Sequence, residues 1–155
     1  AVRELKNKVA AALIGFENKG LTIVEKNGKI YVSLEAKLLF PSGSTVVDPE
    51  GQKALIELAK VLQTEKELEI IVEGHTDTDA LNKATHPKNN WELSVLRATA
   101  VVEIMLAKST MSPKQLMAAG RSEYMPVDPA NKAKNRRIEI IISPDLNELY
   151  KLISK

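Results

Sequence analysis

The chain has 155 residues, of which 44% are hydrophobic and 27% charged, values that fit a single folded domain. Lys and Arg total 22 against 20 Asp and Glu, and this balance argues against a surface dedicated to nucleic acid or to an acidic membrane. The absence of cysteine excludes disulfides, thiolate nucleophiles and cysteine-ligated zinc. No apolar run reaches the ~20 residues of a membrane helix.

The N-terminal part of the chain predicts a helix followed by a β-hairpin. Apolar residues recur at helical spacing over residues 2–17, and Gly20 is the expected stop. Two apolar runs, 21–24 and 30–34, flank Asn27-Gly28, the dipeptide that most strongly predicts a hairpin turn. We therefore expect residues 1–20 to form a flanking helix and residues 21–155 the main domain.

The middle of the chain predicts a helix, a strand and a long loop. Asp48 and Pro49 favour a helix start, with Asp48 as N-cap and Pro49 in the first turn. Residues 68–73 predict an apolar strand that ends in residues 74–77. The polar residues 78–89 follow as a long loop, which we expect to be mobile and largely dispensable for folding. The first helix should bury Leu55, Leu58, Ala59 and Leu62.

The rest of the chain predicts another long helix and a last strand. The helix is expected from about Asn90 to Ala107, burying Leu93, Leu96, Ala100, Val101, Ile104 and Met105. We further expect a capping box over 112–115 that opens a short helix, an irregular stretch over 120–134, a strand over 137–142 and a terminal helix around 146–153. This order predicts an α+β domain (an α/β sandwich) with helices packed on one face of a mixed β-sheet.

Three polar clusters are candidates for function. Gly74-His75-Thr76-Asp77 ends an apolar strand, where open sheets tend to bind ligands. The second cluster, residues 90–97, starts the long helix and includes Arg97. The third, Asn135-Arg136-Arg137, precedes the last strand, and strand alternation should send its two arginines to opposite faces. A purely structural interpretation remains open for each cluster, with Asp77 satisfying loop amides and the arginines forming local ion pairs.

A catalytic metal site is a competing interpretation. His75, Asp77, Asp79 and His86 offer nitrogen and oxygen ligands within a short span, and a zinc hydrolase needs three such ligands and an open position. The chain has no His-Glu-x-x-His motif and no Gly-x-Ser-x-Gly elbow. The sequence therefore gives little support to a catalytic metal site and even less to a serine triad.

Four sequence blocks stand in order along the chain. They are Leu39-Phe40-Pro41-Ser42-Gly43-Ser44, then Ile71 to Asp77, then Asn90-Trp91-Glu92-Leu93-Ser94 with Arg97 and Ala98, and finally Asn135 to Ile140. Together they resemble the OmpA-like peptidoglycan-binding domain over about residues 30–143. That family includes the C-terminal domains of outer-membrane OmpA proteins, the Pal lipoproteins and the flagellar stator protein MotB.

The resemblance implies a non-catalytic domain of the Gram-negative periplasm, without a cofactor, that grips the peptide stem of peptidoglycan, above all a stem that carries diaminopimelate. The two residues that hold diaminopimelate in the family match Asp77 and Arg97. Two further binding positions match Asn90 and Arg136. The remaining candidates are Thr76, Leu93, Phe40 and Ser42.

The sequence also departs from the family pattern. Pro41 stands where the family often has Asp, and Asn131-Lys132-Ala133-Lys134 replaces the usual Glu-Gly-Arg-Ala. The 20-residue separation of Asp77 from Arg97 looks closer to the stator branch.

The resemblance implies an anchor that tethers an outer-membrane protein or lipoprotein to the wall. A flagellar stator anchor at the inner membrane is the close alternative, and a metal-dependent wall hydrolase is the remote one. Membrane attachment is expected only through a segment N-terminal to this sequence, no nucleic-acid partner is expected, and a homodimer is left open.

Overall fold

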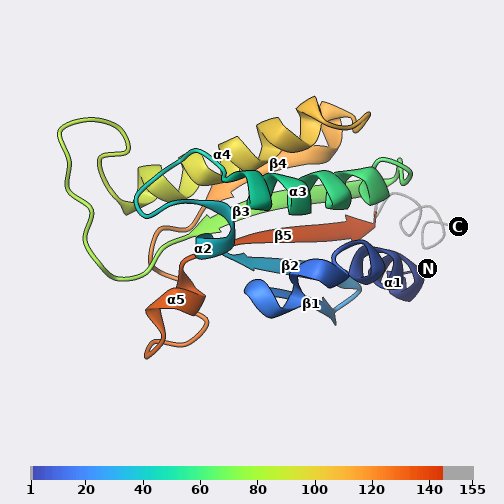
Figure 1. Cartoon of the computed structure of the whole chain (residues 1–155), viewed down its shortest axis with the longest axis horizontal. Coiled ribbons are helices and arrows are strands. Elements are labelled where there is room, and N and C mark those ends of the chain that lie inside the picture. The colour runs from blue at the N-terminus through green and yellow to red at the C-terminus, as the bar shows by residue number, and fades with distance from the viewer. Residues whose placement is uncertain (1, 145–155) are drawn as a thin grey trace, which may run out of the picture.

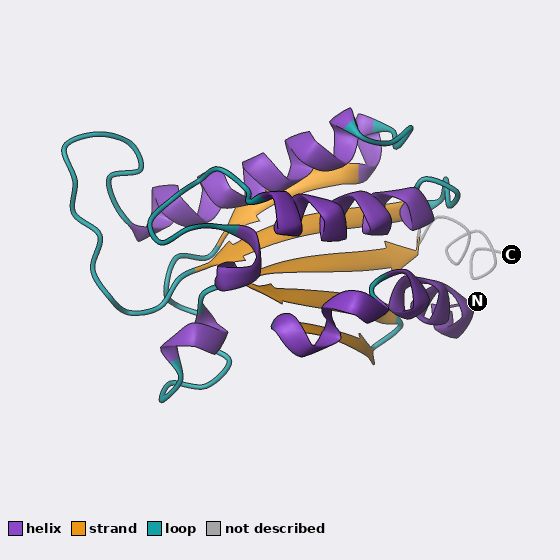
Figure 2. Ribbon diagram, viewed as in Figure 1, coloured by secondary structure: helices purple, strands orange, loops and turns teal. Residues whose placement is uncertain are grey.

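A computed structural model describes residues 2–144 and shows one five-stranded mixed sheet with helices on one face (Figures 1 and 2). The spatial order of the strands is β1-β2-β5-β3-β4. Only the pairing of β3 with β4 is parallel, and the other three pairings are antiparallel. The strands are β1 (Leu21–Lys26), β2 (Lys29–Glu35), β3 (Leu68–His75), β4 (Leu116–Gly120) and β5 (Arg137–Pro144).

Three helices, α1 (Val2–Ala12), α3 (Pro49–Leu62) and α4 (Asn90–Ala107), lie over the same face of this sheet (Figure 2). The expected fold class is therefore confirmed. The buried core lies between these helices and the sheet, and α1 contributes Leu5 and Val9 to it. Short elements complete the described chain: the 3₁₀ helices η1 (Ile14–Lys19) and η2 (Pro113–Gln115), and the helices α2 (Ala36–Leu39) and α5 (Lys132–Asn135).

The hairpin between β1 and β2 forms where Asn27-Gly28 predicts it. Asn27 has φ 54° and Gly28 has φ 75°, the pair of positive values that a two-residue hairpin turn requires. Gly20 ends η1 in the left-handed region with φ 94°. The expected single helix over 2–17 is wrong in one respect, because α1 ends at Ala12 and the chain continues as the separate helix η1.

Two glycines let α4 approach the sheet closely. A Cβ on Gly74 would lie 2.1 Å from the carbonyl oxygen of Ser94, and one on Gly120 would lie 2.4 Å from the Ser94 Oγ. The first turns of α4 therefore rest directly on the ends of β3 and β4. This contact fixes where the side chains of α4 stand relative to the end of β3.

Several local expectations are wrong, and tertiary contacts explain them. The residues of β4 were not expected as a strand, because Leu-Met-Ala-Ala-Gly carries no β-branched residue; the strand forms by pairing with β3. The predicted capping box at 112–115 does not close, since the Gln115 side chain donates instead to the carbonyl oxygens of Glu65, Lys66 and Leu68. A helix does not follow it, only the three-residue η2.

Two side chains differ from their expected roles on helices. Asp48 is the residue before α3, as predicted, but its side chain makes no capping hydrogen bond. Leu96 was expected to be buried and is 37% exposed, because the face of α4 that meets the core runs through Leu93, Ala98, Val101 and Met105. The four residues of α3 that were expected to be buried are buried. The terminal helix expected around 146–153 lies outside the described residues.

Within the described residues, no helix is both long and apolar enough to cross a membrane. The loop over residues 78–89 extends beyond the sheet at the end where β3 finishes (Figure 1). Val2, at the start of α1, lies near the opposite end of the sheet, where it lines a pocket with Leu68 and Pro144.

Candidate ligand-binding groove

A groove of about 500 Å³ lies at the end of β3, bounded by α2 and the loop after it, the start of α4 and the start of β5. Its polar residues come from four segments that are far apart in the sequence. All eight candidate binding residues line it: Phe40, Ser42, Thr76, Asp77, Asn90, Leu93, Arg97 and Arg136. The structure therefore brings together every residue that the resemblance singled out.

Asp77 is buried at the base of the groove, with 6% of its surface exposed. One carboxylate oxygen, Oδ2, accepts a hydrogen bond of 2.9 Å from Nη1 of Arg136. The other, Oδ1, accepts from the backbone N–H of Asp79 at 2.9 Å. Asp77 is thus held in place by its ion pair with Arg136, whose side chain is 46% exposed.

Arg97 is buried to the same degree, at 6% exposure, yet it has no carboxylate within ion-pair distance among the described residues. Its Nε donates to the carbonyl oxygen of Ser44 at 2.9 Å, and its guanidinium lies 4.7 Å from the centre of the Phe40 ring. Burial lowers the pKa of Arg97, and the nearby Arg136 lowers it further, while Asp77 opposes both effects. The site therefore holds a desolvated guanidinium that lacks an anion.

Asn90 and Thr76 shape the groove through backbone contacts. The Asn90 amide donates to the carbonyl oxygen of Asp79 at 3.0 Å, and the Thr76 hydroxyl donates to that of Asp77 at 2.9 Å. These bonds fix the turn that carries the Asp77 carboxylate. The predicted opposite orientation of Arg136 and Arg137 is confirmed, since Arg136 lines the groove whereas Arg137 is buried against Glu139.

Several lining residues were not predicted. Lys37 and Asp48 line the groove together with Ala80 and Leu81. Lys37 belongs to α2, a four-residue helix without a clear sequence signal, and Asp48 was assigned a capping role. Lys132, in the segment that departs from the family pattern, donates to Asp79 Oδ1 at 2.6 Å, and this bond raises the pKa of Lys132. It ties α5 to the loop that borders the groove.

The four candidate metal ligands do not meet. Asp77 lines the groove, whereas the His75 Nε2 atom lies against Glu73 and Glu139. His86 is exposed and pairs with Glu92. The hydrolase site proposed from these four residues therefore does not form in the described structure.

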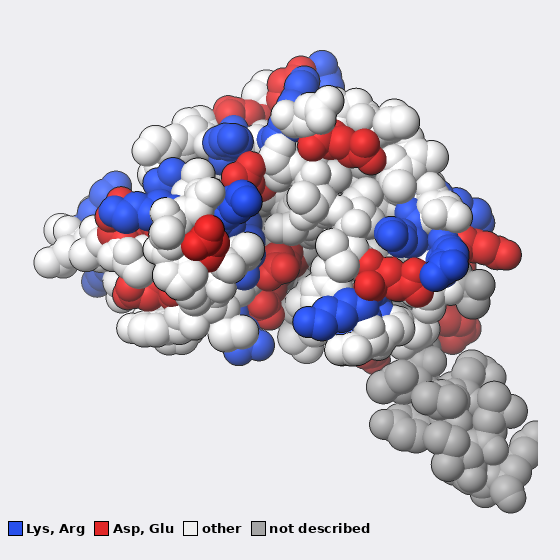
Figure 3. All heavy atoms as spheres, turned by 90° about the horizontal axis from the view of Figure 1, so that it is seen from below, with Lys and Arg blue, Asp and Glu red and all other residues white. Residues whose placement is uncertain are grey.

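Acidic and basic side chains are interspersed across the face drawn in Figure 3, and neither sign dominates it. The charges inside the groove therefore say more about the ligand than the charge of that surface does.

Known proteins resemble this chain in sequence and in fold. Motility protein B of Helicobacter pylori (strain J99) is 30% identical over 155 residues, which cover 96% of this chain and 60% of that protein. A crystal structure of a putative MotB-like protein from Desulfovibrio vulgaris has a TM-score of 0.84 at 27% identity and covers 93% of this chain and 94% of that one. The cell wall anchor of the T6SS from Pseudomonas aeruginosa has a TM-score of 0.77 at 28% identity, covering 90% and 99% of the two chains.

The chain spans about half the length of the curated relatives it matches. The OmpA family matches residues 39–139, a stretch that begins just before Phe40 and ends after Arg136 and so includes all eight candidate residues. This chain belongs to the OmpA family.

Proposed function

We propose that this domain binds peptidoglycan without covalent chemistry and that its groove holds the diaminopimelate of the peptide stem. The observation that carries the proposal is Arg97, a guanidinium buried to 6% exposure with no carboxylate partner in the described part of the chain. A buried charge without a counter-ion is costly, so a groove of this kind favours an anionic ligand.

Diaminopimelate fits the charges that line the groove. Its side chain ends in an ammonium and a carboxylate on one carbon. The Nη groups of Arg97 form no hydrogen bond within residues 2–144, so they can donate to that carboxylate as a planar fork. Asp77, whose carboxylate is held by Arg136 and a backbone N–H, can accept from the ammonium as well, because a carboxylate has about four acceptor positions.

This arrangement predicts selectivity between wall types. A stem with lysine at the same position has the ammonium but not the carboxylate, so Arg97 would remain without its anion. A groove of this size also needs no aromatic platform for sugars, which agrees with the low aromatic content of 4%.

The test is co-sedimentation of the chain with insoluble diaminopimelate-type peptidoglycan, with lysine-type peptidoglycan as the comparison. We expect retention on the first and at least tenfold weaker retention on the second. Arg97→Ala should also reduce retention on diaminopimelate-type peptidoglycan. Arg3→Ala is its matched control, because the Arg3 side chain is 82% exposed and lies 3.8 Å from its partner Glu25. Equal binding to both walls would contradict the proposed recognition of diaminopimelate, and release of soluble muropeptides by the pure protein would contradict binding without catalysis.

We further propose a periplasmic wall anchor as the biological role. The groove lies at the end of β3, whereas Val2 lies near Leu68, where β3 begins, so a tether that enters at Val2 would leave the groove free to face the wall.

Two carriers fit this role: an outer-membrane protein or lipoprotein, and a stator of the motility protein B type in the inner membrane. The similarity to motility protein B, which covers 96% of this chain and so extends to α1 and the hairpin, favours the second carrier. The full-length N-terminal sequence distinguishes them, because a stator has a membrane helix there and a lipoprotein has a signal peptide that ends at a cysteine.

A further inference from the structure

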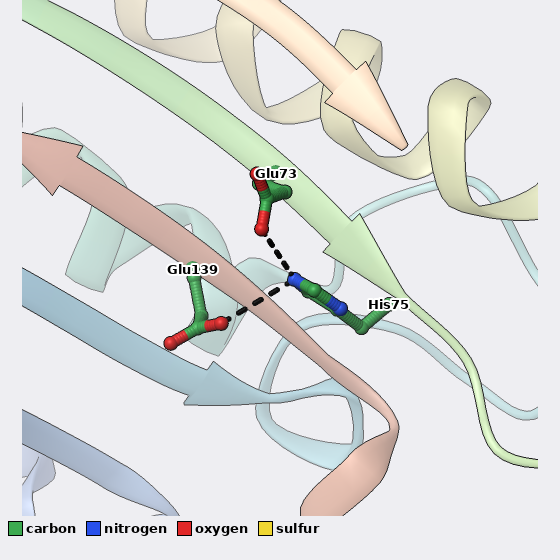
Figure 4. Close-up of side chains that lie close together, drawn as sticks. All are labelled: Glu73, His75 and Glu139. Atoms are coloured by element: carbon green, nitrogen blue, oxygen red, sulfur yellow. Dashed lines mark hydrogen bonds and ion pairs between the residues drawn. The ribbon is translucent and has the colours of Figure 1, made fainter. Parts of the chain in front are cut away.

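A second cluster of titratable side chains lies on the sheet face that α3 and α4 leave uncovered. Glu73 and His75 belong to β3 and Glu139 to β5, and the strand register sets Glu73 directly opposite Glu139. Gly74, between the two β3 residues, packs against Ser94 of α4, so Glu73 and His75 project to the other face. Figure 4 shows the His75 ring turned toward both carboxylates.

The three side chains lie close enough together for one metal ion to bridge them. The His75 Nε2 atom lies 2.8 Å from Glu73 Oε1 and 3.3 Å from Glu139 Oε2. One ligand atom from each of the three residues lies within 4.8 Å of the others. In tetrahedral zinc sites the nitrogen and oxygen ligands stand about 2.0–2.2 Å from the metal, and hence roughly 3.3 Å from one another.

The buried ring of His75 directs its Nε2 atom at the two carboxylates. Its side chain is 1% exposed, and its Nδ1 atom has no hydrogen-bond partner in the described structure, so every polar contact of the ring is directed at the two carboxylates. A single Nε2–H cannot donate well to two acceptors at once. A metal ion in that position would instead be shared by the histidine and both carboxylates.

Two arginines already supply positive charge to this cluster. Arg121 Nε lies 3.3 Å from Glu73 Oε2, and Arg137 Nη2 lies 3.0 Å from Glu139 Oε2. Each carboxylate of the cluster therefore has its own cationic neighbour besides His75.

One of these arginines orients the cluster, and the other leaves it open to solvent. Arg137 also donates to the carbonyl oxygens of Met125 and Asn135, so it stays fixed and orients Glu139. The side chain of Arg121 is 54% exposed and can move into solvent. The Glu73 and Glu139 side chains keep 12% and 21% exposure, which gives an ion a route from solvent.

We propose that Glu73, His75 and Glu139 bind one divalent transition-metal ion, and that zinc is the best fit to this set of one nitrogen and two oxygen donors. The bound ion would link β3 to β5 on the uncovered face of the sheet and keep one coordination position open. Magnesium and calcium suit the site less well, since they prefer six or more oxygen ligands. The site is separate from the groove and does not depend on peptidoglycan binding.

The experiment is calorimetric titration of the whole chain with zinc chloride, together with thermal melting at increasing zinc concentration. We expect one equivalent to bind with a dissociation constant in the micromolar range. Zinc at about 100-fold excess over this constant should raise Tm by roughly 5–10 °C, and magnesium should not. Cobalt substitution adds an absorption spectrum that reports the coordination number directly.

Glu139→Gln is the principal variant, because it keeps the shape of a partly exposed side chain and removes its charge. We expect zinc to bind it at least tenfold more weakly. His86→Gln is the matched control, since His86 is the other histidine of the chain and also pairs with a glutamate, Glu92. His75→Gln should abolish binding if it folds. Absence of zinc binding to the wild type, unchanged affinity in Glu139→Gln, or loss of affinity in His86→Gln would each overturn the proposal.

Discussion

Arg97→Ala is the substitution that most directly tests the proposed groove. If Arg97 donates to the diaminopimelate carboxylate as a bidentate fork, the substitution removes a charge-assisted contact worth roughly 1.5–3 kcal/mol. Affinity for a diaminopimelate-containing stem peptide should then fall by about one to two decades. Calorimetric titration of that peptide measures the loss.

The same substitution should have a modest effect on stability, because two opposed changes occur. Losing the 2.9 Å hydrogen bond to Ser44 and the position over the Phe40 ring costs about 1–3 kcal/mol. Removing a buried cation that has no counter-ion and stands near Arg136 returns part of this. We expect a net destabilisation of about 1 kcal/mol, which lowers Tm by roughly 2–4 °C.

Two further variants separate binding from folding. Arg97→Met keeps an apolar stem against Phe40 and removes the charge, so it should bind as weakly as Arg97→Ala while melting close to the wild type. Arg97→Lys keeps a charge but not the planar fork, and it should lose much of the affinity too. Wild-type affinity in a folded Arg97→Ala protein would refute the clamp and leave Arg97 as a structural residue.

Asp77→Asn should weaken peptide binding by about tenfold, measured by the same titration, because it removes the charge that faces the ligand ammonium and keeps the shape of the side chain. Gly74→Ala should destabilise the fold by about 3 kcal/mol and lower Tm strongly, since the added Cβ meets the backbone of α4. Gly15→Ala is its control: a Cβ at Gly15 has no neighbour within 4 Å, and this variant should melt like the wild type. Replacing the exposed residues 82–85 by glycine and serine should change Tm by less than about 2 °C; a loss of cooperative unfolding would show that the loop is structural. Glu92→Gln should lower Tm at pH 7 and have a smaller effect below pH 4.5. Hydrogen bonds in the folded state lower the pKa of Glu92, and the stability that they provide is lost as the carboxylate is protonated. An equal change in Tm at both pH values would contradict this.

Much of the fold could be predicted from the sequence because local signals and tertiary packing agree. Asn27-Gly28 has the backbone that its turn type demands, and the face of α3 follows helical spacing. The strand β4 could not be found in this way. Its five residues have little preference for extended structure, and parallel pairing with β3 decides their conformation.

The site was more predictable by resemblance than by spacing. Helix and strand periodicity could not show that Phe40, Asp77 and Arg97 share one groove, because their meeting depends on how α2 and α4 pack. The order of the four sequence blocks, through their resemblance to the OmpA-like domain, predicted that these residues belong to one site. Two neighbours of the site were not predicted. Lys132 lies where the sequence departs from the family pattern, and Asp48 was interpreted as a helix cap.

The arrangement of charges favours the proposed ligand clamp over an internal ion pair. If Asp77 and Arg97 served only to stabilise the fold, they would be expected to pair with each other. Instead Asp77 pairs with Arg136, and Arg97 is left buried without an anion. Of the two guanidinium groups in the groove, only that of Arg136 pairs with a carboxylate within residues 2–144, and a ligand carboxylate would be the partner of the other. The proposed zwitterionic ligand would supply that carboxylate and bring its ammonium toward Asp77, so that Arg97 would gain its counter-ion on binding.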